Sequence, residues 1–418
     1  MKEEQNYLMV TVSGQDGPGI AAAFTGILSE HHVEIMDIEQ ASSQDLLGLY
    51  FLLDLSSVTS KKDSVIKDLL FEASQRGLNL QFKLYSQTEV QISNQRPLFV
   101  ITHFGGTKAL AALTQILGDE NVNIESITTI HNYGRRTMEM AVDVRTKENL
   151  TRIKKRLMIK SCELGFDMAI QKMEAYRKNK RLIVFDMDST LVDMEIIDEI
   201  ALRAGVKREV SRVTEKAMRG DLDFEESLRQ RVAFLRGISK DTLEEIRQKM
   251  VLSKGVEELI RTLKFLGYKI GVVTGGFDFF SNHLKEKLGL DYAFANKLEL
   301  KNGILTGRVI EDVIDAAGKA RIINHIARKE KILLDQVVAV GDGANDALML
   351  GQAGLGIAYN ARKSLVNAAN MSIGKERLTN ILILLGITEE DVQEALVIDR
   401  EIHEEYRKNS SSTTPDPL

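Results

Sequence analysis

The stretch RLIVFDMDSTLVD, residues 181–193, constrains the fold of this chain more than any other segment. It opens with the apolar run Leu182–Phe185 and continues at once with acidic and hydroxyl residues. Such a run is typical of a strand buried in a parallel sheet, which delivers polar groups to the sheet edge where it ends. Asp186 could then attack phosphorus, and Asp188 could donate and accept protons. Alone, a D-x-D pair is more often a turn or a helix cap, so this interpretation needs support from the rest of the chain.

Two later apolar runs end in polar residues in the same way. YKIGVVTGG at residues 268–276 ends in a threonine and two glycines, and residues 337–340 lead into GDGAND. The alternation of these runs with helical patterns predicts a doubly wound parallel α/β sheet of the Rossmann type. The carboxyl ends of its strands share one edge, where ligands bind. We therefore expect Asp186, Thr274 and Asp342 to converge, with Lys319 nearby.

Residues 194–265 contain no strand pattern and are expected to form a helical cap over the end of the first strand. Arg231 follows Phe224 by two helical turns and therefore lies on the same helix face, at the edge of an apolar stripe. A guanidinium there needs an anionic partner or a route to water, and a lone arginine usually reaches water. Glu195 likewise fits a first-turn glutamate favoured by the helix dipole. Both residues are thus either substrate contacts or ordinary surface charges.

Local signals predict two further features of this half. Asn302-Gly303 between apolar residues at 298–307 indicates a hairpin turn. Asp241 with Glu244 predicts a capping box at the start of a helix in the insert.

The first part of the chain contains an internal repeat. ILSEHHVEIMDI at residues 27–38 lines up with ILGDENVNIESI at 116–127, and the order of patterns suggests two small βαββαβ sandwiches. Both copies resemble the ACT family of amino-acid-sensing modules, which implies a ferredoxin-like α+β fold for each.

One loop of the first copy resembles the ligand loop of the ACT family. It consists of Asp16, Gly17, Pro18 and Gly19, at a helix start where backbone N–H groups could hold a carboxylate. The second copy has GGTK at residues 105–108 and lacks the proline. The resemblance implies an amino-acid effector, which we expect to be L-serine, whereas loops that are only tight turns in a dimerising pair fit the same residues.

Four segments of the second half together resemble the haloacid-dehalogenase superfamily of phosphatases. They are DMDST, Thr274, Lys319 and GDGAND, in this order. Within the superfamily, Glu195 and FEESLRQRV at 224–232 resemble the branch that hydrolyses O-phospho-L-serine, although that branch usually has serine in place of Thr274. The resemblance implies a Mg²⁺-dependent phosphomonoesterase that forms a phosphoaspartate and releases L-serine and phosphate, the last step of serine biosynthesis.

The same resemblance implies a role for each matching residue. Asp186 would be the nucleophile and Asp188 the general acid and base. Mg²⁺, which suits crowded carboxylates and phosphate oxygens, would be held by the side chains of Asp186 and Asp342 and the backbone carbonyl of Asp188, while Asp346 orients Lys319. The expected substrate contacts are Glu195, Phe224, Arg231, Thr274, Gly275, Lys319 and Asn345.

Three other functions remain compatible with parts of the sequence. They are a phosphatase for another small phosphomonoester, a signalling receiver, and an amino-acid sensor whose phosphatase half is inactive. Glu195 and Arg231 favour an amino-acid substrate, and Asp188 argues against a receiver because an acid/base residue favours turnover. The intact motifs argue against an inactive phosphatase half.

Composition sets the cellular context that we expect. The net charge of −5 argues against nucleic-acid binding as the main activity, and the single cysteine, Cys162, excludes an internal disulfide. The start lacks a signal-peptide pattern, and no apolar run approaches the roughly 18 residues of a membrane span. We therefore expect a cytoplasmic protein without nucleic-acid or membrane partners, forming a homodimer through the ACT-like domains.

The 418 residues leave room for several domains. The expected division is ACT-like domains at 1–90 and 91–178, a phosphatase core at 179–193 and 266–390, the cap at 194–265, and a charged tail at 391–418 that is disordered at its end.

Overall fold

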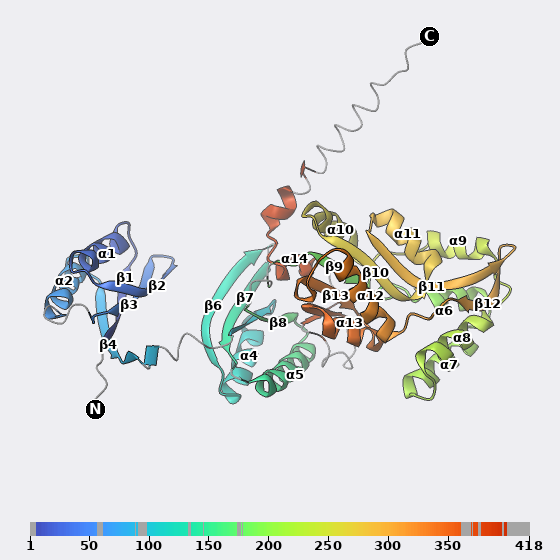
Figure 1. Ribbon diagram of the computed structural model, residues 1–418, viewed down its shortest axis with the longest axis horizontal. Coiled ribbons are helices and arrows are strands. Elements are labelled where there is room, and N and C mark those ends of the chain that lie inside the picture. The colour runs from blue at the N-terminus through green and yellow to red at the C-terminus, as the bar shows by residue number, and fades with distance from the viewer. Residues whose placement is uncertain are drawn as a thin grey trace, which may run out of the picture. The chain divides into compact units, whose positions relative to one another are not determined.

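The computed structural model describes residues 6–56, 62–87, 89–90, 98–132, 135–144, 146–173, 177, 179–360, 369, 371–374, 378–394 and 397–398 (Figure 1). It divides the chain into two units, Met1–Arg96 and Pro97–Leu418, which are described separately. Within these described residues, no helix has the length and apolar character needed to cross a membrane. Most of the predicted tail at 391–418 lies outside them.

The first unit is a four-stranded antiparallel sheet with two helices on one face. Its elements are β1 (Tyr7–Gln15), α1 (Ile20–Glu30), β2 (Glu34–Ser43), β3 (Leu46–Asp54), α2 (Lys62–Gln75) and β4 (Asn79–Tyr85). The strand order is β2-β3-β1-β4. Alternate residues of β1, including Val10 and Val12, are buried in one core with Phe24 of α1. This is the ferredoxin-like sandwich expected for an ACT domain.

The second copy of the repeat has the same order of elements but belongs to the second unit. Its elements are β5 (Leu98–His103), α4 (Thr107–Asp119), β6 (Asn123–Asn132), β7 (Arg135–Asp143), α5 (Lys147–Leu164) and β8 (Met168–Lys172). Its strand order, β8-β5-β7-β6, corresponds to that of the first copy. The predicted duplication is therefore confirmed at the level of topology.

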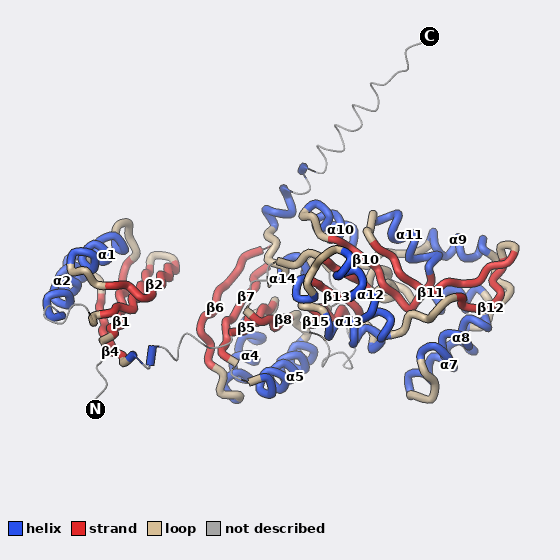
Figure 2. The backbone as a smooth tube through the Cα atoms, in the orientation of Figure 1, coloured by secondary structure: helices blue, strands red, loops and turns tan. Residues whose placement is uncertain are grey.

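The remainder of the second unit is a doubly wound sheet with helices on both faces (Figure 2). Its sheet elements and their flanking helices are β9 (Leu182–Phe185), α10 (Val256–Phe265), β10 (Lys269–Phe277), α11 (Asp278–Leu288), β11 (Tyr292–Lys301), β12 (Ile304–Ile310), α12 (Ala316–Lys329), η1 (Leu334–Gln336), β13 (Val337–Gly341), η2 (Ala344–Asp346), α13 (Ala347–Gln352), β14 (Leu355–Tyr359), β15 (Met371–Ile373) and α14 (Asn380–Leu384). Six strands of this sheet run parallel, and their order in space is β11-β10-β9-β13-β14-β15. This is the Rossmann order, and β12 adds an antiparallel edge through the predicted turn at Asn302-Gly303.

The two faces of the central strand β9 belong to different cores. Leu182 and Val184 pack with residues of α12 and α13, whereas Ile183 and Phe185 pack with residues of α10 and α11. Burial on both faces explains why the strand is apolar throughout rather than alternating.

The insert between β9 and β10 is helical, as predicted. Ahead of α10 it contains α6 (Ile196–Arg203), α7 (Lys207–Arg219), α8 (Phe224–Phe234) and α9 (Lys240–Gln248). The predicted cap of α9 is wrong: Ser239 is the N-cap, and its hydroxyl accepts a hydrogen bond from Thr242 N. Asp241 lies instead inside the first helical turn, where its negative charge interacts favourably with the positive end of the helix dipole.

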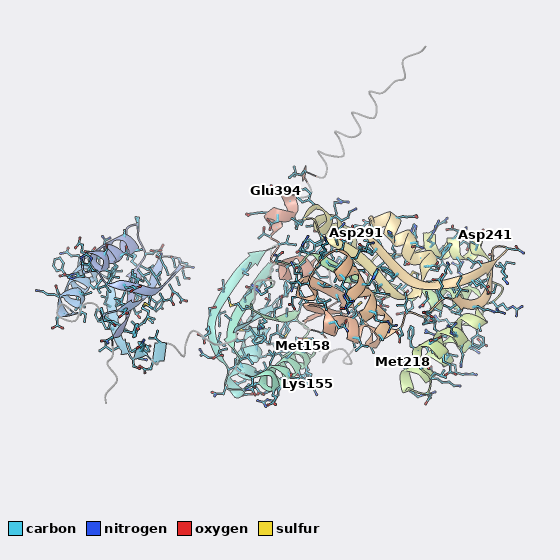
Figure 3. All side chains as sticks on the ribbon, viewed as in Figure 1. Lys155, Met158, Met218, Asp241, Asp291 and Glu394 are labelled. Carbon is cyan, nitrogen blue, oxygen red and sulfur yellow. The ribbon has the colours of Figure 1, made fainter. Side chains whose placement is uncertain are left out.

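The second ACT-like copy is joined to the doubly wound sheet. β8 pairs antiparallel with β15 through Ala169 opposite Met371, which gives one sheet of 11 strands. Asp167 accepts hydrogen bonds from Gly374 N at 2.6 Å and Asn380 Nδ2 at 2.9 Å. Met158 of α5, which is labelled in Figure 3, belongs to the same buried cluster as Leu182 and Val184 of β9. The second copy thus forms a structural extension of the doubly wound domain.

Candidate active site

The predicted catalytic carboxylates meet at the carboxyl ends of two adjacent strands. Asp186 follows β9 and Asp342 follows β13, and these strands pair in parallel with Phe185 opposite Val340. Asp186 N donates to Val340 O at 2.8 Å, which extends this pairing to the first aspartate. In the Rossmann order, the gap between β9 and β13 is the point where the strand order reverses, and ligands bind there.

Lys319 reaches this edge from the first turn of α12. Its Nζ lies 2.7 Å from an oxygen of Asp186 and 2.7 Å from an oxygen of Asp346, and the side chain is only 1% exposed. Burial alone would lower the pKa of Lys319, but the two carboxylates outweigh it and raise that pKa. The lysine therefore stays positively charged in the interior and neutralises part of the acidic cluster.

Three carboxylates form an acidic cluster around the single ammonium group of Lys319. Carboxylate oxygens of Asp186, Asp342 and Asp346 all lie within 4.8 Å of one another. Burial, with the charges of Asp186 and Asp346, raises the pKa of Asp342 to about 7. Burial and Asp186 raise the pKa of Asp346 to about 6. A hard divalent cation with oxygen ligands would stabilise the ionised forms, so these residues suit such an ion.

Asp188 is held beside the cluster in a different environment. Its Oδ1 accepts a hydrogen bond from Ile196 N at 3.0 Å, and a Cβ atom on Gly276 would come within 2.7 Å of its Oδ2. Only glycine at position 276 leaves room for this carboxylate. Although part of Asp188 remains open to solvent, the surrounding protein atoms and the charges of Glu195 and Asp186 raise its pKa well above the usual range. A protonated carboxyl group next to Asp186 has the properties of a general acid.

Two opposite charges flank the carboxylates on the cap side. Glu195 is the N-cap residue of α6 and accepts a hydrogen bond from Ser189 Oγ at 2.9 Å. Arg231 on α8 donates from Nε to Ser227 O at 3.3 Å. Among the described residues, no carboxylate lies within ion-pair distance of the Arg231 guanidinium. Burial lowers the pKa of Arg231, and the charge of Asp198 acts in the opposite direction.

The sequence analysis did not identify two residues that act on Glu195 and Arg231: Ser189, which donates a hydrogen bond to Glu195, and Asp198, whose charge acts on Arg231. Ser189 has a positive φ of 55°, which is uncommon for a residue other than glycine. Its place inside the DMDST motif was the available signal. Asp198, one helical turn after Glu195, is the largest favourable charge acting on Arg231. Its spacing from Glu195 could have indicated that it lies on the same helix face.

The remaining predicted contacts lie around the end of β10 and after β13. Thr274 is buried, and Phe224 of α8 packs against Gly275 so closely that a Cβ atom there would lie 2.8 Å from the ring. Asn345 lies in η2, directly before Asp346. The structure therefore gathers all the predicted catalytic, metal and substrate residues of the second half around one edge of the sheet.

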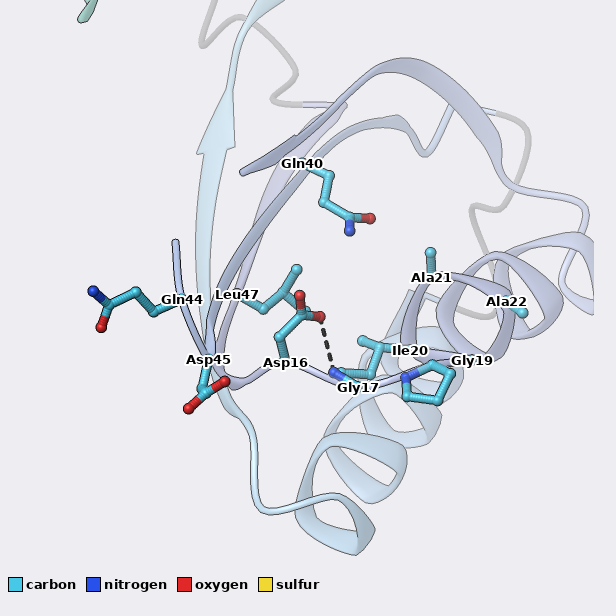
Figure 4. A pocket seen from close by; sticks show the side chains of 11 residues that line it. Asp16, Gly17, Gly19, Ile20, Ala21, Ala22, Gln40, Gln44, Asp45 and Leu47 are labelled. Carbon is cyan, nitrogen blue, oxygen red and sulfur yellow. Dashed lines mark hydrogen bonds between the residues drawn. The ribbon is translucent and has the colours of Figure 1, made fainter. Parts of the chain in front are cut away.

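The predicted effector loop lies in the first unit and lines a separate pocket of 520 Å³ (Figure 4). Asp16 Oδ1 accepts from Gly17 N at 2.8 Å, and Asp16 Oδ2 accepts from Ser42 Oγ at 2.6 Å. Gly19 is the N-cap of α1, with a φ of 88° that favours glycine. Gln40, Gln44 and Asp45 complete the polar part of the lining. The pocket thus combines a helix N-terminus with carboxylates, groups that could bind the two charged ends of an amino acid.

Comparison with known proteins agrees with this architecture. Residues 180–354 match the haloacid dehalogenase-like hydrolase family, and residues 6–83 and 102–171 each match an ACT-domain family. A solved haloacid-dehalogenase-family hydrolase from Salmonella enterica serovar Typhi, 28% identical, covers 69% of this chain and 98% of its own, with a TM-score of 0.59.

Two relatives show similarity in sequence, one over part of this chain and one over most of it. A phosphoserine phosphatase from Archaeoglobus fulgidus is 50% identical over 254 residues, which make up 61% of this chain and 74% of that protein. A phosphoserine phosphatase from Streptomyces coelicolor is 38% identical over 395 residues, 93% of this chain and 94% of that protein. The similarity therefore includes the ACT domains as well as the catalytic half, and this chain belongs to the phosphoserine phosphatase family.

Proposed function

We propose that this chain hydrolyses O-phospho-L-serine to L-serine and phosphate through a phosphoaspartate on Asp186. The observation that carries the proposal is the Arg231 guanidinium, which has no carboxylate partner among the described residues and faces the charges of Asp198, Glu195 and Asp188. An arginine placed there can pair with a substrate carboxylate in a fork geometry. Glu195 supplies the opposite charge for the substrate ammonium group.

The proposed reaction has two halves. In the first, an oxygen of Asp186 attacks phosphorus, the bond from phosphorus to the serine oxygen breaks, and Asp188 gives its proton to that oxygen. In the second, Asp188 takes a proton from water, whose oxygen attacks phosphorus and frees Asp186. The raised pKa of Asp188 supports the first role because the group must carry a proton when substrate arrives. Lys319 and Thr274 would hold phosphoryl oxygens as charge shifts onto them.

The acidic cluster fits Mg²⁺ as the partner of this chemistry. Side chains of Asp186 and Asp342, with the backbone carbonyl of Asp188, would hold the ion. Asp346 would orient Lys319, a role supported by their 2.7 Å contact and by the bond from Gly343 N to the other oxygen of Asp346. When bound, Mg²⁺ would supply positive charge to the carboxylates and to the phosphoryl group.

Substrate selectivity tests the proposal directly. Arg231→Ala should reduce kcat/KM for O-phospho-L-serine by about tenfold to a hundredfold, because charge-assisted bonds of roughly 1.5–3 kcal/mol are lost. Turnover of p-nitrophenyl phosphate, which lacks a carboxylate, should change little. Arg229→Ala is the matched control, since Arg229 lies on the same helix and pairs with exposed Glu225. Equal losses on both substrates in the Arg231 variant would refute an amino-acid substrate.

We also propose that the first ACT domain binds an amino acid, with L-serine as the expected effector, in a homodimer built through the ACT domains. The pocket at Asp16–Gly19 supports this because it offers backbone N–H groups to a carboxylate and Asp16 and Asp45 to an ammonium group. Removing only the first unit, by starting near Pro97, leaves the pairing of β8 with β15 intact. Serine inhibition that persists unchanged without this unit, and in Pro18→Ala, would place the effect in the catalytic pocket instead.

A further inference from the structure

Asn296 has no part in the chemistry described so far, yet both ends of its side chain are engaged next to the site. It lies in β11 and is 2% exposed. Its Nδ2 donates to Gly275 O at 2.8 Å, and its Oδ1 accepts from Ile314 N at 2.7 Å. A carbonyl can only accept and a backbone N–H can only donate, so the two partners fix which end of the amide is which.

The first partner belongs to the peptide group that follows Thr274-Gly275. The N–H of the same peptide group, on Gly276, donates to Thr274 Oγ1 at 2.9 Å. Asn296 therefore holds the carbonyl of a peptide whose N–H orients the Thr274 hydroxyl. Because Oγ1 accepts that bond, its own proton remains available for a phosphoryl oxygen. Thr274, Gly275 and Gly276 lie at the end of β10, where its register with β11 shifts between Val273 and Phe277. Two successive glycines are intrinsically free in their backbone angles, so this segment needs an anchor from another element.

The second partner stands directly before the helix that carries Lys319. Asp315, the residue after Ile314, is the N-cap of α12 and accepts from Gly318 N at 2.6 Å. Lys319 N donates to Asp315 O at 2.9 Å. The position of Ile314 therefore bears on where the first turn of α12, and with it Lys319, is placed.

We propose that Asn296 is a positioning residue for phosphoryl transfer, which links Thr274, Gly275 and Gly276 at the end of β10 to the start of α12. Through this tie, the Thr274 hydroxyl and the Lys319 ammonium group keep a fixed separation and meet the same phosphoryl group. Asn296 itself does not touch the substrate. The inference rests on the proposed phosphatase activity, but it concerns the phosphoryl end of the substrate and is independent of what the rest of the substrate is.

Two substitutions test it in the full chain. Asn296→Asp keeps the shape and the bond from Ile314 N but cannot donate to Gly275 O, and Asn296→Leu removes both bonds without adding a charge. Both should lower kcat/KM about tenfold to a hundredfold, since small displacements of catalytic groups have effects of this size. The loss should be the same for O-phospho-L-serine and p-nitrophenyl phosphate, and inhibition by inorganic phosphate should weaken in parallel.

The control is Asn324→Asp. Asn324 Nδ2 also donates to a backbone carbonyl, that of Ala320 at 2.9 Å, but this bond lies within α12 and does not involve Gly275. This variant should retain wild-type kcat/KM on both substrates. Values within about twofold of wild type in both Asn296 variants, or a loss confined to O-phospho-L-serine, would overturn the proposal. A wild-type enzyme that prefers the aryl phosphate would contradict the proposed substrate while leaving the test of Asn296 valid.

A measurement on the wild-type protein covers the case in which neither variant folds. Ile314 lies outside every helix and strand of the described chain, so its amide has no secondary-structure partner. Because Oδ1 of Asn296 accepts its hydrogen, the amide should exchange with solvent at least tenfold more slowly than that of an open loop. Exchange of the Ile314 amide at the rate of an unprotected loop would refute the hydrogen bond from Ile314 N to Asn296 Oδ1 and, with it, the proposal.

Discussion

Replacing Lys319 by methionine should affect stability and catalysis together, because one ammonium group compensates two buried carboxylates. At 2.7 Å, each ion pair represents about 6 kcal/mol of direct attraction with an effective dielectric constant of about 20. The cost of taking these charges out of water offsets much of this attraction. Removing one partner of a buried pair typically costs about 3–5 kcal/mol. We therefore expect Lys319→Met to reduce the free energy of unfolding of the second unit, Pro97–Leu418, by about this amount.

Catalysis should fall further than stability alone explains. Lys319 is proposed to contact a phosphoryl oxygen, and loss of one such donor typically lowers kcat about a hundredfold to a thousandfold. Unfolding in urea is best followed by circular dichroism, because the chain contains no tryptophan. Mg²⁺ should restore part of the lost stability, since the ion supplies positive charge to the same carboxylates, but should not restore kcat.

A second buried lysine provides the control for this prediction. Lys180 is 7% exposed and donates to the backbone carbonyl of Asp335 at 2.6 Å. Lys180→Met should reduce stability while leaving kcat per folded molecule unchanged. The reasoning fails if Lys319→Met is as stable as the wild type in the absence of Mg²⁺, because the carboxylates would then not need the lysine charge.

Two further predictions concern the acidic site, and a third concerns His103 of β5. Asp186→Asn should abolish turnover and phosphoaspartate formation while leaving the circular dichroism spectrum unchanged, and near-normal phosphate release would refute Asp186 as the nucleophile. Asp342→Asn should remove the Mg²⁺-dependent rise in thermal midpoint that we expect of the wild type; an unchanged rise would show that the ion binds elsewhere. His103 is fully buried, and burial lowers its pKa, so the unfolded chain takes up a proton below pH of about 6.5 that the folded chain resists. Wild-type stability should therefore fall as the pH drops from 7.5 to 5.5, and His103→Leu, compared by urea unfolding at both pH values, should lose less; equal losses would contradict this role of His103.

The catalytic half could be predicted closely because its chemistry is encoded next to its strands. Each apolar run ends in the polar residues that it positions, and parallel strands bring their carboxyl ends to one edge. This local rule alone predicts that Asp186, Thr274 and Asp342 lie together. The repeat of the first half likewise predicted two sandwiches, because the same hydrophobic spacing recurs in both copies.

Other features depend on contacts between segments that are distant in the sequence. Nothing local distinguishes Lys319 from an exposed helix lysine, and only the packing of α12 against the sheet buries it between two carboxylates. The same holds for Asn296, whose two partners, Gly275 and Ile314, come from other elements. Ser239 displaced Asp241 as the helix cap because cap geometry depends on where the backbone enters the helix.

The largest difference lies between the two ACT copies, which the sequence presents as equivalent. In each four-stranded sandwich taken by itself, the fourth strand lies at an edge, where the outer backbone groups can pair with another strand. Among the described strands, a phosphatase strand, β15, pairs with that edge in the second copy and not in the first, so the second copy shares a sheet with the catalytic core. Hydrophobic periodicity determined which faces each copy buries. It carries no information about edge pairing, because backbone hydrogen bonds are common to all residues except proline, and only the tertiary structure decided which edge was covered.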